Sequence, residues 1–275
     1  MEKIIIFILG RYLNFVNLFS KKWGGKQAFL VFCYPFPTKL KPKQAEFYKT
    51  SERIDFVFEE KRIACYKWGR GAKVILCLHG WQSQTFRWKK FIETLDKELY
   101  TIIAVDAPGH GNSEGRLLHI PKYSRLVEYL IQSFKVDYIL AHSMGAFASL
   151  NLFHQKPELS PEKIAVLGTP GEVSDFLALY SFILGLSARS RKNMEEYIQA
   201  YFNATPSDFS IRKIAATQHT KGLIIHDKDD KEAPFHYAEL VHEIWENADI
   251  HVTEGLGHKL RSIEVVDRVV SFFED

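Results

Sequence analysis

A serine stands between small residues in the segment Ala141-His142-Ser143-Met144-Gly145, an arrangement that suits nucleophilic chemistry. The segment follows an apolar run and opens a helical pattern, so the chain must turn sharply at Ser143. Residues two before and two after the serine must be small, because larger side chains would collide with neighbouring backbone. Such a turn projects the Ser143 hydroxyl and lets the backbone N–H of Met144 face a developing oxyanion.

Partners for this serine can be found downstream, in two segments that each follow an apolar run. A serine hydroxyl needs an adjacent base, and the base needs an acid that orients it. The segment 226–234 carries the carboxylates Asp227, Asp229 and Asp230. The segment 253–258 ends in His258, which lies in a glycine-flanked loop where an imidazole could reach Ser143. The order serine, acid, histidine is the one that a serine turn of this kind demands.

The elements that must position these residues alternate after residue 54. A hairpin is predicted at 54–59 and 62–68, followed by strands at 74–78, 101–105, 138–141, 164–167, 223–226 and 250–253. Helices are predicted at 86–99, 123–134, 144–154, 235–245 and 263–273. Short apolar strands alternating with helices predict an α/β fold with a mostly parallel central sheet flanked by helices. Functional groups gather at the carboxyl ends of such strands, where this chain places its Ser, Asp and His residues.

Two segments stand outside the alternation. Residues 1–50 form a basic, amphipathic N-terminal segment, and residues 51–275 form the main domain. Between about 171 and 221 the chain has no convincing strand, and its pattern predicts two amphipathic helices. An insertion of this length is expected to be a small helical cap rather than a plain loop.

Five motifs follow predicted strands in a fixed order. They are His79-Gly80-Trp81, Asp106–Ser113, Ala141–Gly145, Asp230 with Pro234, and Gly257-His258. On these motifs, the chain resembles the α/β-hydrolase superfamily, in its serine-esterase form with a cap insertion. The resemblance covers nearly all of residues 54–275. The resemblance implies Ser143 as nucleophile, Asp230 as acid, His258 as base, and an oxyanion hole from the N–H groups of Trp81 and Met144. It calls for no metal and no organic cofactor.

The acid segment departs from the family pattern. Asp227 stands where the family usually has glycine, so three carboxylates compete for one role. The spacing to Pro234 favours Asp230 over Asp229, since the base requires a single orienting carboxylate. The two others are expected to cap the turn or to face solvent.

The function expected from these residues is hydrolysis of a carboxylic ester or a related small acyl substrate. One alternative is a ligand-binding protein on the same fold without hydrolytic activity, because function does not follow from fold. A second alternative is carbon–carbon bond hydrolysis or lyase chemistry on the same three residues. Covalent labelling of Ser143 and substrate screening separate these possibilities.

Charge is unevenly distributed along the 275 residues, whose formal net charge is +3. Residues 1–50 carry a net charge of +7 and the remainder −4. The overall charge is too weak for a dedicated nucleic-acid binder. The apolar run Ile4–Leu9 is too short for a spanning helix or a signal peptide.

Two interpretations of the N-terminal segment remain open. A basic, aromatic-rich helix could lie on an anionic membrane surface, with residues 1–40 in peripheral contact. Alternatively, its aromatic side chains pack a helix onto the main domain. These side chains are Phe7, Phe15, Phe19, Phe29 and Phe32.

The three cysteines, Cys33, Cys65 and Cys77, form no C-x-x-C pair. An odd count without such a pair argues against a disulfide framework and against a zinc site. We therefore expect a reducing, cytoplasmic location.

Overall fold

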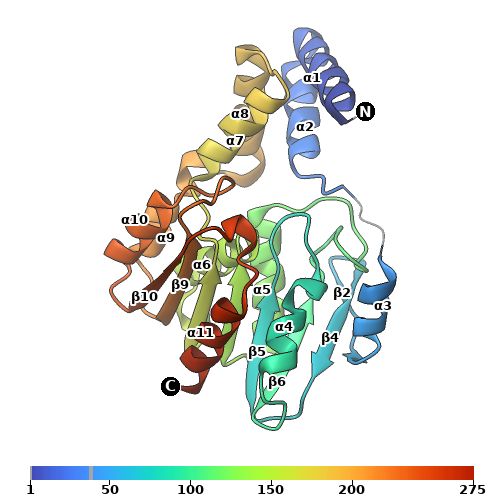
Figure 1. Ribbon diagram of the computed structural model, residues 1–275. Coiled ribbons are helices and arrows are strands. Elements are labelled where there is room, and N and C mark those ends of the chain that lie inside the picture. The colour runs from blue at the N-terminus through green and yellow to red at the C-terminus, as the bar shows by residue number, and fades with distance from the viewer. Residues whose placement is uncertain (1, 37–39) are drawn as a thin grey trace. The chain divides into compact units, whose positions relative to one another are not determined.

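The computed structural model describes residues 2–36 and 40–275, which form two compact units (Figure 1). The helical unit comprises the chain up to Tyr34 together with Gly171–Lys213. The sheet unit comprises Pro35–Pro170 and Ile214–Asp275. These boundaries differ from the sequence-based ranges, because the N-terminal helices group with the insertion and residues 35–50 group with the sheet.

The sheet unit is built on an eight-stranded, mostly parallel sheet. In order across the sheet, the strands are β1 (Glu52–Arg53), β4 (Cys65–Trp68), β6 (Tyr100–Val105), β5 (Lys73–Leu78), β7 (Tyr138–His142), β8 (Lys163–Leu167), β9 (Lys221–Asp227) and β10 (Ala248–Thr253). Only the β1–β4 and β4–β6 pairs are antiparallel. The short strands β2 (Phe56–Phe58) and β3 (Lys61–Ile63) pair separately as a hairpin. The predicted α/β class and the positions of the strands from residue 74 onward are confirmed, whereas the predicted strand 62–68 is divided between β3 of the hairpin and β4 of the main sheet.

The register of the parallel strands aligns their carboxyl ends along one edge of the sheet. Leu78 of β5 pairs with Ala141 of β7, and His142 pairs with Leu167 of β8. Asp227, the last residue of β9, pairs with Thr253, the last residue of β10. The loops that leave β5, β7, β9 and β10 therefore start from the same edge.

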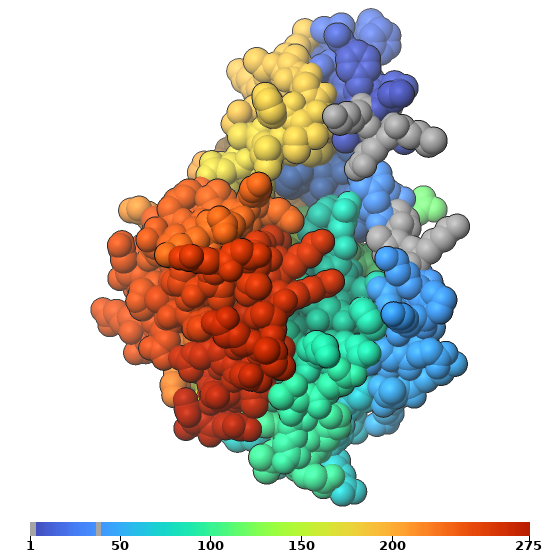
Figure 2. Space-filling model, viewed as in Figure 1, coloured from blue at the N-terminus to red at the C-terminus, as the bar shows by residue number. Residues whose placement is uncertain are grey.

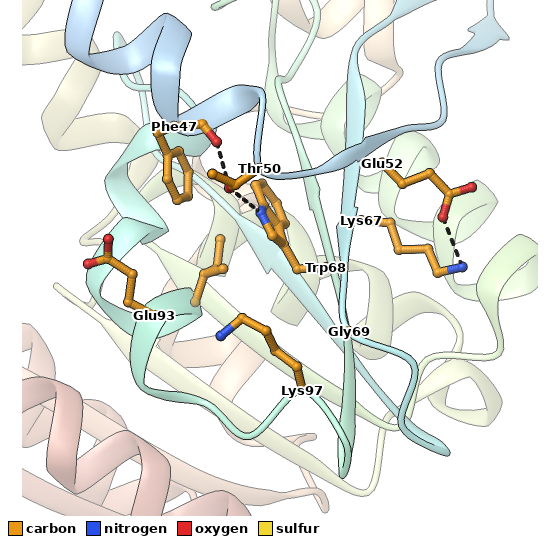
Figure 3. Close-up of a pocket in the computed structure, with 9 residues that line it drawn as sticks. Phe47, Thr50, Glu52, Lys67, Trp68, Gly69, Glu93 and Lys97 are labelled. Carbon is orange, nitrogen blue, oxygen red and sulfur yellow. Dashed lines mark hydrogen bonds and ion pairs between the residues drawn. The ribbon is translucent and has the colours of Figure 1, made fainter.

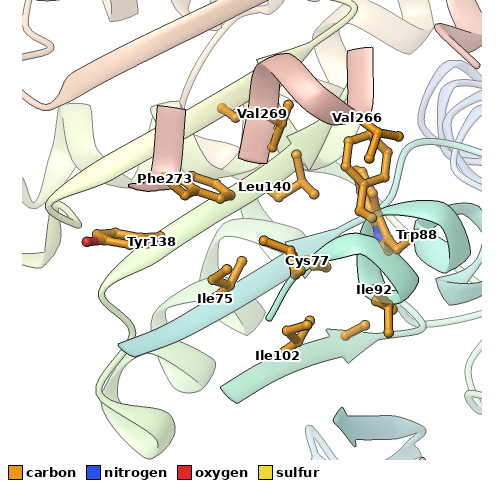
Figure 4. Close-up of a cluster of buried hydrophobic side chains, with 14 of the residues drawn as sticks. Ile75, Cys77, Trp88, Ile92, Ile102, Tyr138, Leu140, Val266, Val269 and Phe273 are labelled. Carbon is orange, nitrogen blue, oxygen red and sulfur yellow. The ribbon is translucent and has the colours of Figure 1, made fainter. Parts of the chain in front are cut away.

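Helices cover both faces of this sheet. In Figure 1, α4 (Lys89–Thr94) and α11 (Ile263–Glu274) lie in front of it, with α5 (Ile120–Phe134) and α6 (Met144–Gln155) behind. Figure 4 shows Ile75 and Cys77 of the sheet beneath Val266 and Val269 of α11, in one buried apolar cluster. Burial on both faces explains why the strands read as continuous apolar runs.

Two predicted elements, the helix 86–99 and the hairpin turn, have different limits in the structure because of local turn geometry. The predicted helix 86–99 is a 3₁₀ turn, η1 (Thr85–Trp88), followed by α4, which ends at Thr94. The side chain of Asp96 accepts the N–H of Glu98 at 2.8 Å, a local bond that competes with helix continuation. The hairpin turns at Glu59 and Glu60, one residue earlier than predicted, and both have positive φ as a tight primed turn requires.

Residues 42–48 form α3 (Pro42–Tyr48), which packs on the sheet unit. Phe47 is buried and stacks on Trp68 with ring centroids 5.2 Å apart. This stacking explains why the boundary lies near residue 35 rather than residue 50. The remaining short helices of the described chain are α9 (Ile211–Ala215), α10 (His236–Ile244), η2 (Pro157–Leu159) and η4 (Gly257–Lys259).

The helical unit contains α1 (Glu2–Phe19), α2 (Lys21–Phe32), α7 (Val173–Ile183), α8 (Ala188–Phe202) and η3 (Pro206–Asp208). The two helices predicted for the insertion are thus confirmed as α7 and α8. Phe29 of α2 is buried against the rings of Tyr197 and Phe202 of α8, and Phe32 packs on Tyr180 of α7. The expectation that all five N-terminal phenylalanines pack inward is wrong for the three on α1, each at least 60% exposed. None of the helices in the described ranges has the length and apolar character needed to cross a membrane.

Candidate active site

Ser143 occupies a strained turn between β7 and α6. Its φ of +50° and ψ of −117° are rare for a residue with a side chain, and such strain persists only where the surroundings enforce it. The backbone N–H of Ser143 donates to the carbonyl of Leu167 at 3.0 Å. A Cβ at Gly145 would lie 2.5 Å from the carbonyl oxygen of Leu78, so only glycine fits two residues after the serine. Because Met144 opens α6, its N–H has no carbonyl one turn earlier in the helix and is available to a bound group.

Asp230 and His258 form a direct hydrogen bond across two loops. The Nδ1 of His258 lies 2.7 Å from the Oδ2 of Asp230, whose carboxylate is buried. Burial alone would raise the pKa of Asp230. The hydrogen bonds from His258 and from the N–H groups of Ala233 and Glu232 outweigh it and lower this pKa below 3.8. Asp230 is therefore an ionised acceptor at neutral pH, which holds the proton of His258 on Nδ1 and leaves Nε2 free to accept one.

A second histidine, His226, lies beside Asp230, a role that the sequence did not predict for it. The fully buried ring of His226 accepts the N–H of Thr169 on Nδ1 at 2.9 Å. Its Nε2–H therefore points at the carbonyl of Ala233 at 2.8 Å and lies 3.3 Å from the Oδ2 of Asp230. Burial lowers the pKa of His226, so it acts as a neutral donor beside the carboxylate. The sequence signal that could have identified His226 is its position at the end of a strand, next to the segment that carries Asp230.

The competing carboxylates, Asp227 and Asp229, take different roles. Asp227 is fully buried at the end of β9, so of the two expected roles it takes that of a turn cap. It accepts the N–H of Asp229 at 3.0 Å, as expected of a turn cap, and it also receives the hydroxyl of Thr253 at 2.7 Å and the N–H of Leu256 at 2.9 Å. Asp229 is exposed and accepts the N–H of Gly255 at 3.0 Å. Both side chains thus form hydrogen bonds between the loop after β9, which carries Asp230, and the loop after β10, which carries His258.

His142 links the serine turn to the histidine loop. Its Nε2 lies 2.8 Å from the backbone oxygen of His258, and the two rings are 4.7 Å apart. Burial lowers the pKa of His142 well below 6.5, so the ring is neutral and donates from Nε2. The residue preceding Ser143 is therefore bonded to the residue whose imidazole would act as base. The Nε2 of His258 is also 3.9 Å from the exposed carboxylate of Glu232.

The loop after β5, which carries the predicted oxyanion donor Trp81, is held by two buried histidines. His79 accepts the N–H of Ala107 on Nε2 at 2.9 Å, so its Nδ1–H donates to the carbonyl of Gly80 at 2.7 Å. His110 accepts the N–H of Gln82 on Nε2 at 3.1 Å. Burial lowers the pKa of His79 to about 4 and that of His110 to about 3. Both rings are neutral acceptors at pH 7 and fix the loop on either side of Trp81.

Asp106 joins this loop to the turn that follows β6. Its buried carboxylate accepts the N–H of Thr85 at 2.7 Å and that of Asn112 at 2.8 Å. Burial raises the pKa of Asp106, while these hydrogen bonds act in the opposite direction. Asp106 is thus a buried anchor of the loop that carries Trp81.

An open pocket of about 440 Å³ on the sheet unit lies away from these residues. Figure 3 shows Phe47, Thr50 and Trp68 on one of its walls, and none of the predicted site residues lines it. The hydroxyl of Thr50 donates to the carbonyl of Phe47 and accepts the indole N–H of Trp68, so these polar groups are already satisfied. Within the described ranges, no three His, Cys, Asp or Glu side chains gather as metal ligands.

The chain is similar in sequence to proteins that are named as hydrolases. The uncharacterized hydrolase YugF of Bacillus subtilis is 35% identical over 106 residues, which cover 37% of this chain but only 38% of that relative. A serine hydrolase-like protein of Homo sapiens is 28% identical over 173 residues, covering 58% of this chain and 79% of the relative.

Solved structures of low sequence identity share the fold. Est1E from Butyrivibrio proteoclasticus, solved with ferulic acid, aligns with a TM-score of 0.66 at 15% identity and covers 80% of this chain and 98% of its own. The esterase of Exiguobacterium antarcticum aligns with a TM-score of 0.61 at 20% identity, covering 78% and 96%. The model of the alpha/beta hydrolase family matches residues 75–271, most of the chain, and this chain therefore belongs to the alpha/beta hydrolase family.

Proposed function

We propose that this chain is a serine hydrolase that cleaves a carboxylic ester or a related small acyl substrate through an acyl-enzyme on Ser143. The observation that carries the proposal is the 2.7 Å hydrogen bond between the buried Asp230 and His258, whose backbone is bonded to the residue preceding the strained Ser143. The serine hydrolase-like relative and the esterase of Exiguobacterium antarcticum support the same chemistry.

In the proposed reaction, the Oγ of Ser143 attacks the acyl carbonyl while the Nε2 of His258 takes the hydroxyl proton. Asp230 holds the imidazole in the tautomer that leaves Nε2 free and stabilises the positive charge that forms. The N–H groups of Met144 and Trp81 stabilise the oxyanion. His258 then returns the proton to the leaving alcohol. In the second half, it activates a water that hydrolyses the acyl-enzyme and regenerates Ser143.

The proposal also includes a role for the helical insertion and a location of the protein in the cell. Gly171–Lys213 leaves the sheet unit after β8 and returns before β9, and we assign it the role of a cap for the acyl substrate. The cysteines Cys33, Cys65 and Cys77 are all free and buried, which supports a reducing, cytoplasmic location. Subcellular fractionation tests the location.

The decisive experiment combines covalent labelling with steady-state kinetics. A fluorophosphonate should label the wild-type chain once, and peptide mass spectrometry should find the label on Ser143. Turnover of short p-nitrophenyl esters should fall at least about 10³-fold in Ser143→Ala.

The matched control is Ser160→Ala, an exposed serine in the loop before β8. This variant should keep wild-type labelling and turnover. A folded wild-type chain that takes no label, or ester turnover that survives in Ser143→Ala, would overturn the proposal. Small-molecule binding retained after loss of Ser143, without turnover, would favour a ligand-binding protein instead.

A further inference from the structure

The outward face of α1 is apolar along its whole length. Eight large apolar side chains of this 18-residue helix are at least 44% exposed. At 100° per residue, they occupy a continuous arc of about 160°, with Ile4, Ile8, Phe15 and Phe19 at and around its centre. Arg11 is the one charged residue of the arc, and its guanidinium lies 5.2 Å from the ring centre of Phe7. Figure 2 shows α1, in dark blue, at the surface of the helical unit.

Polar contacts fix which face of α1 points outward. Asn14 donates to the carbonyl of Gly185 and accepts the hydroxyl of Ser190, each at 2.8 Å. Asn17 is fully buried and accepts the side-chain N–H of Asn193 of α8 at 2.8 Å. Rotation of α1 to bury its apolar arc would break these bonds and leave buried amides without partners, which is unfavourable. The exposed arc is therefore a consequence of specific packing within the helical unit.

Basic and aromatic side chains border this arc where α1 meets α2. Phe19 is followed by the exposed Lys21 and Lys22, and Trp23 is 49% exposed at the start of α2. Lys26, one turn further along α2, is exposed as well. Tryptophan and lysine beside an apolar helix face are typical of the interface between water and lipid.

The net charge of the helical unit indicates which kind of partner binds the apolar arc of α1. Its residues include ten Lys or Arg and six Asp or Glu, a net charge of +4, and residues 1–34 supply all of this excess. A second copy of the chain would bring the same positive charge against the arc. Anionic lipid headgroups complement it, while the apolar side chains enter the acyl boundary.

We propose that the outer face of α1 docks the protein on an anionic membrane surface. The helix lies in the plane of the interface, with Ile4, Ile8, Phe15 and Phe19 inserted between lipids. Lys22 and Lys26 contact the phosphates. This docking does not depend on the chemistry proposed for Ser143.

Flotation of the full chain with extruded vesicles tests this docking. One set contains phosphatidylcholine alone, and the other contains phosphatidylcholine and phosphatidylglycerol at 3:1. Wild-type protein should bind the anionic vesicles at least tenfold more tightly than the neutral ones, and added salt should reduce the difference because it screens the headgroups.

Two variants separate the apolar and the electrostatic contributions. I8S/F15S/F19S should bind anionic vesicles at least tenfold more weakly, since three inserted side chains are lost. K22E/K26E should weaken binding to anionic vesicles at least fivefold and leave binding to neutral vesicles unchanged.

Matched controls change equally exposed residues of the sheet unit. They are V57S/L99S/I263S for the apolar change and K61E/K90E for the charge change. Both should bind as the wild type does, and all variants should keep its circular dichroism and its activity on soluble esters. Folded wild-type protein that does not bind anionic vesicles would overturn the proposal, as would unchanged binding by I8S/F15S/F19S. A dimer that I8S/F15S/F19S dissociates, with no vesicle binding by the wild type, would instead identify the arc as an interface between copies.

Discussion

Replacing Asp227 with asparagine tests whether this buried carboxylate holds the proposed acid and base together. The substitution keeps the shape of the side chain and removes its charge. The carboxylate receives N–H or hydroxyl donors from both loops: Asp229 on one side, and Thr253 and Leu256 on the other. Burial would raise the pKa of Asp227, but these bonds outweigh it and lower the pKa below 3.8, so all of them are made to an anion at neutral pH.

The size of the effect follows from these contacts. An asparagine must turn its NH₂ group toward at least one existing donor, which breaks one hydrogen bond and leaves that donor unpaired at a cost of about 1–3 kcal/mol. The other bonds change from charged to neutral and lose about 1 kcal/mol each. Relief from burying a charge offsets part of this loss. We expect Asp227→Asn to lower the free energy of unfolding by about 2–4 kcal/mol.

Activity should fall more than the change in stability alone explains. Asp227 lies three residues before Asp230, and Leu256 lies two residues before His258. Loosening this tie allows the two side chains to drift, and a displacement of about 1 Å can reduce turnover about 10²-fold. At a temperature where the variant remains folded, kcat for p-nitrophenyl acetate and the rate of fluorophosphonate labelling should therefore both fall about 10–100-fold.

The control is Asp229→Asn, because Asp229 is exposed and makes one bond between the same loops. It should change the free energy of unfolding by less than about 1 kcal/mol and leave turnover within about threefold. Chemical denaturation followed by circular dichroism measures stability, and steady-state kinetics measures activity. If Asp227→Asn is as stable and active as wild type, or no more affected than Asp229→Asn, Asp227 does not hold the two loops together.

Three further predictions concern the acid, the oxyanion loop and the helical unit. Asp230→Asn should reduce kcat about 10²–10⁴-fold at neutral pH, because the amide cannot stabilise the histidine tautomer and its charge, while Asp229→Asn should not. Since burial depresses the pKa of His79 to about 4 and that of His110 to about 3, folding should weaken as pH falls from about 6.5 toward 4. Thermal unfolding at pH 5 against pH 7.5 should reveal a loss of about 1–2 kcal/mol per ring. Gly10→Ala would place a Cβ 1.7 Å from a backbone oxygen at the end of α7, and it should destabilise the helical unit by about 1–3 kcal/mol in denaturation.

Each of these three has a result that contradicts it. Full activity in Asp230→Asn would move the acid to another carboxylate. Equal thermal stability at pH 5 and pH 7.5 would mean that folding does not depress the pKa values of His79 and His110. Wild-type stability in Gly10→Ala would mean that α1 can move away from α7 without loss.

Much of the sheet unit could be predicted because its strands are buried on both faces. The runs 74–78 and 138–141 are apolar throughout, and each is followed by a histidine, so their type and limits are visible locally. The serine turn was equally visible, since the strained Ser143 has a small residue two positions before it and another two positions after it, where a Cβ at Gly145 would meet the backbone. Structural features that are determined by neighbouring residues in the chain can therefore be predicted from the sequence.

The packing of the N-terminal helices could not be predicted in the same way. The inward face of α1 carries Asn14 and Asn17, whose partners Ser190 and Asn193 are 176 residues away. Its outward face is the more apolar of the two, so a rule that places apolar residues inward predicts the wrong face. The pairing of these amides and the close approach at Gly10 determine the orientation of this helix.

Distance along the chain also explains why the proposed reacting residues could be predicted from motifs while the residues that position them could not. His142 bonds to the backbone of a residue 116 positions later, and Asp227 bonds to one 29 positions later. Nothing in the types of these residues indicates their partners, because a buried histidine or aspartate satisfies its hydrogen bonds wherever the fold supplies a donor or an acceptor. The buried polar residues connect the ends of β7, β9 and β10, which the register of the sheet brings to one edge. Substitutions at His142, His226 or Asp227 should therefore alter turnover although Ser143, Asp230 and His258 are all still present, a pattern that inspection of the motifs alone would not predict.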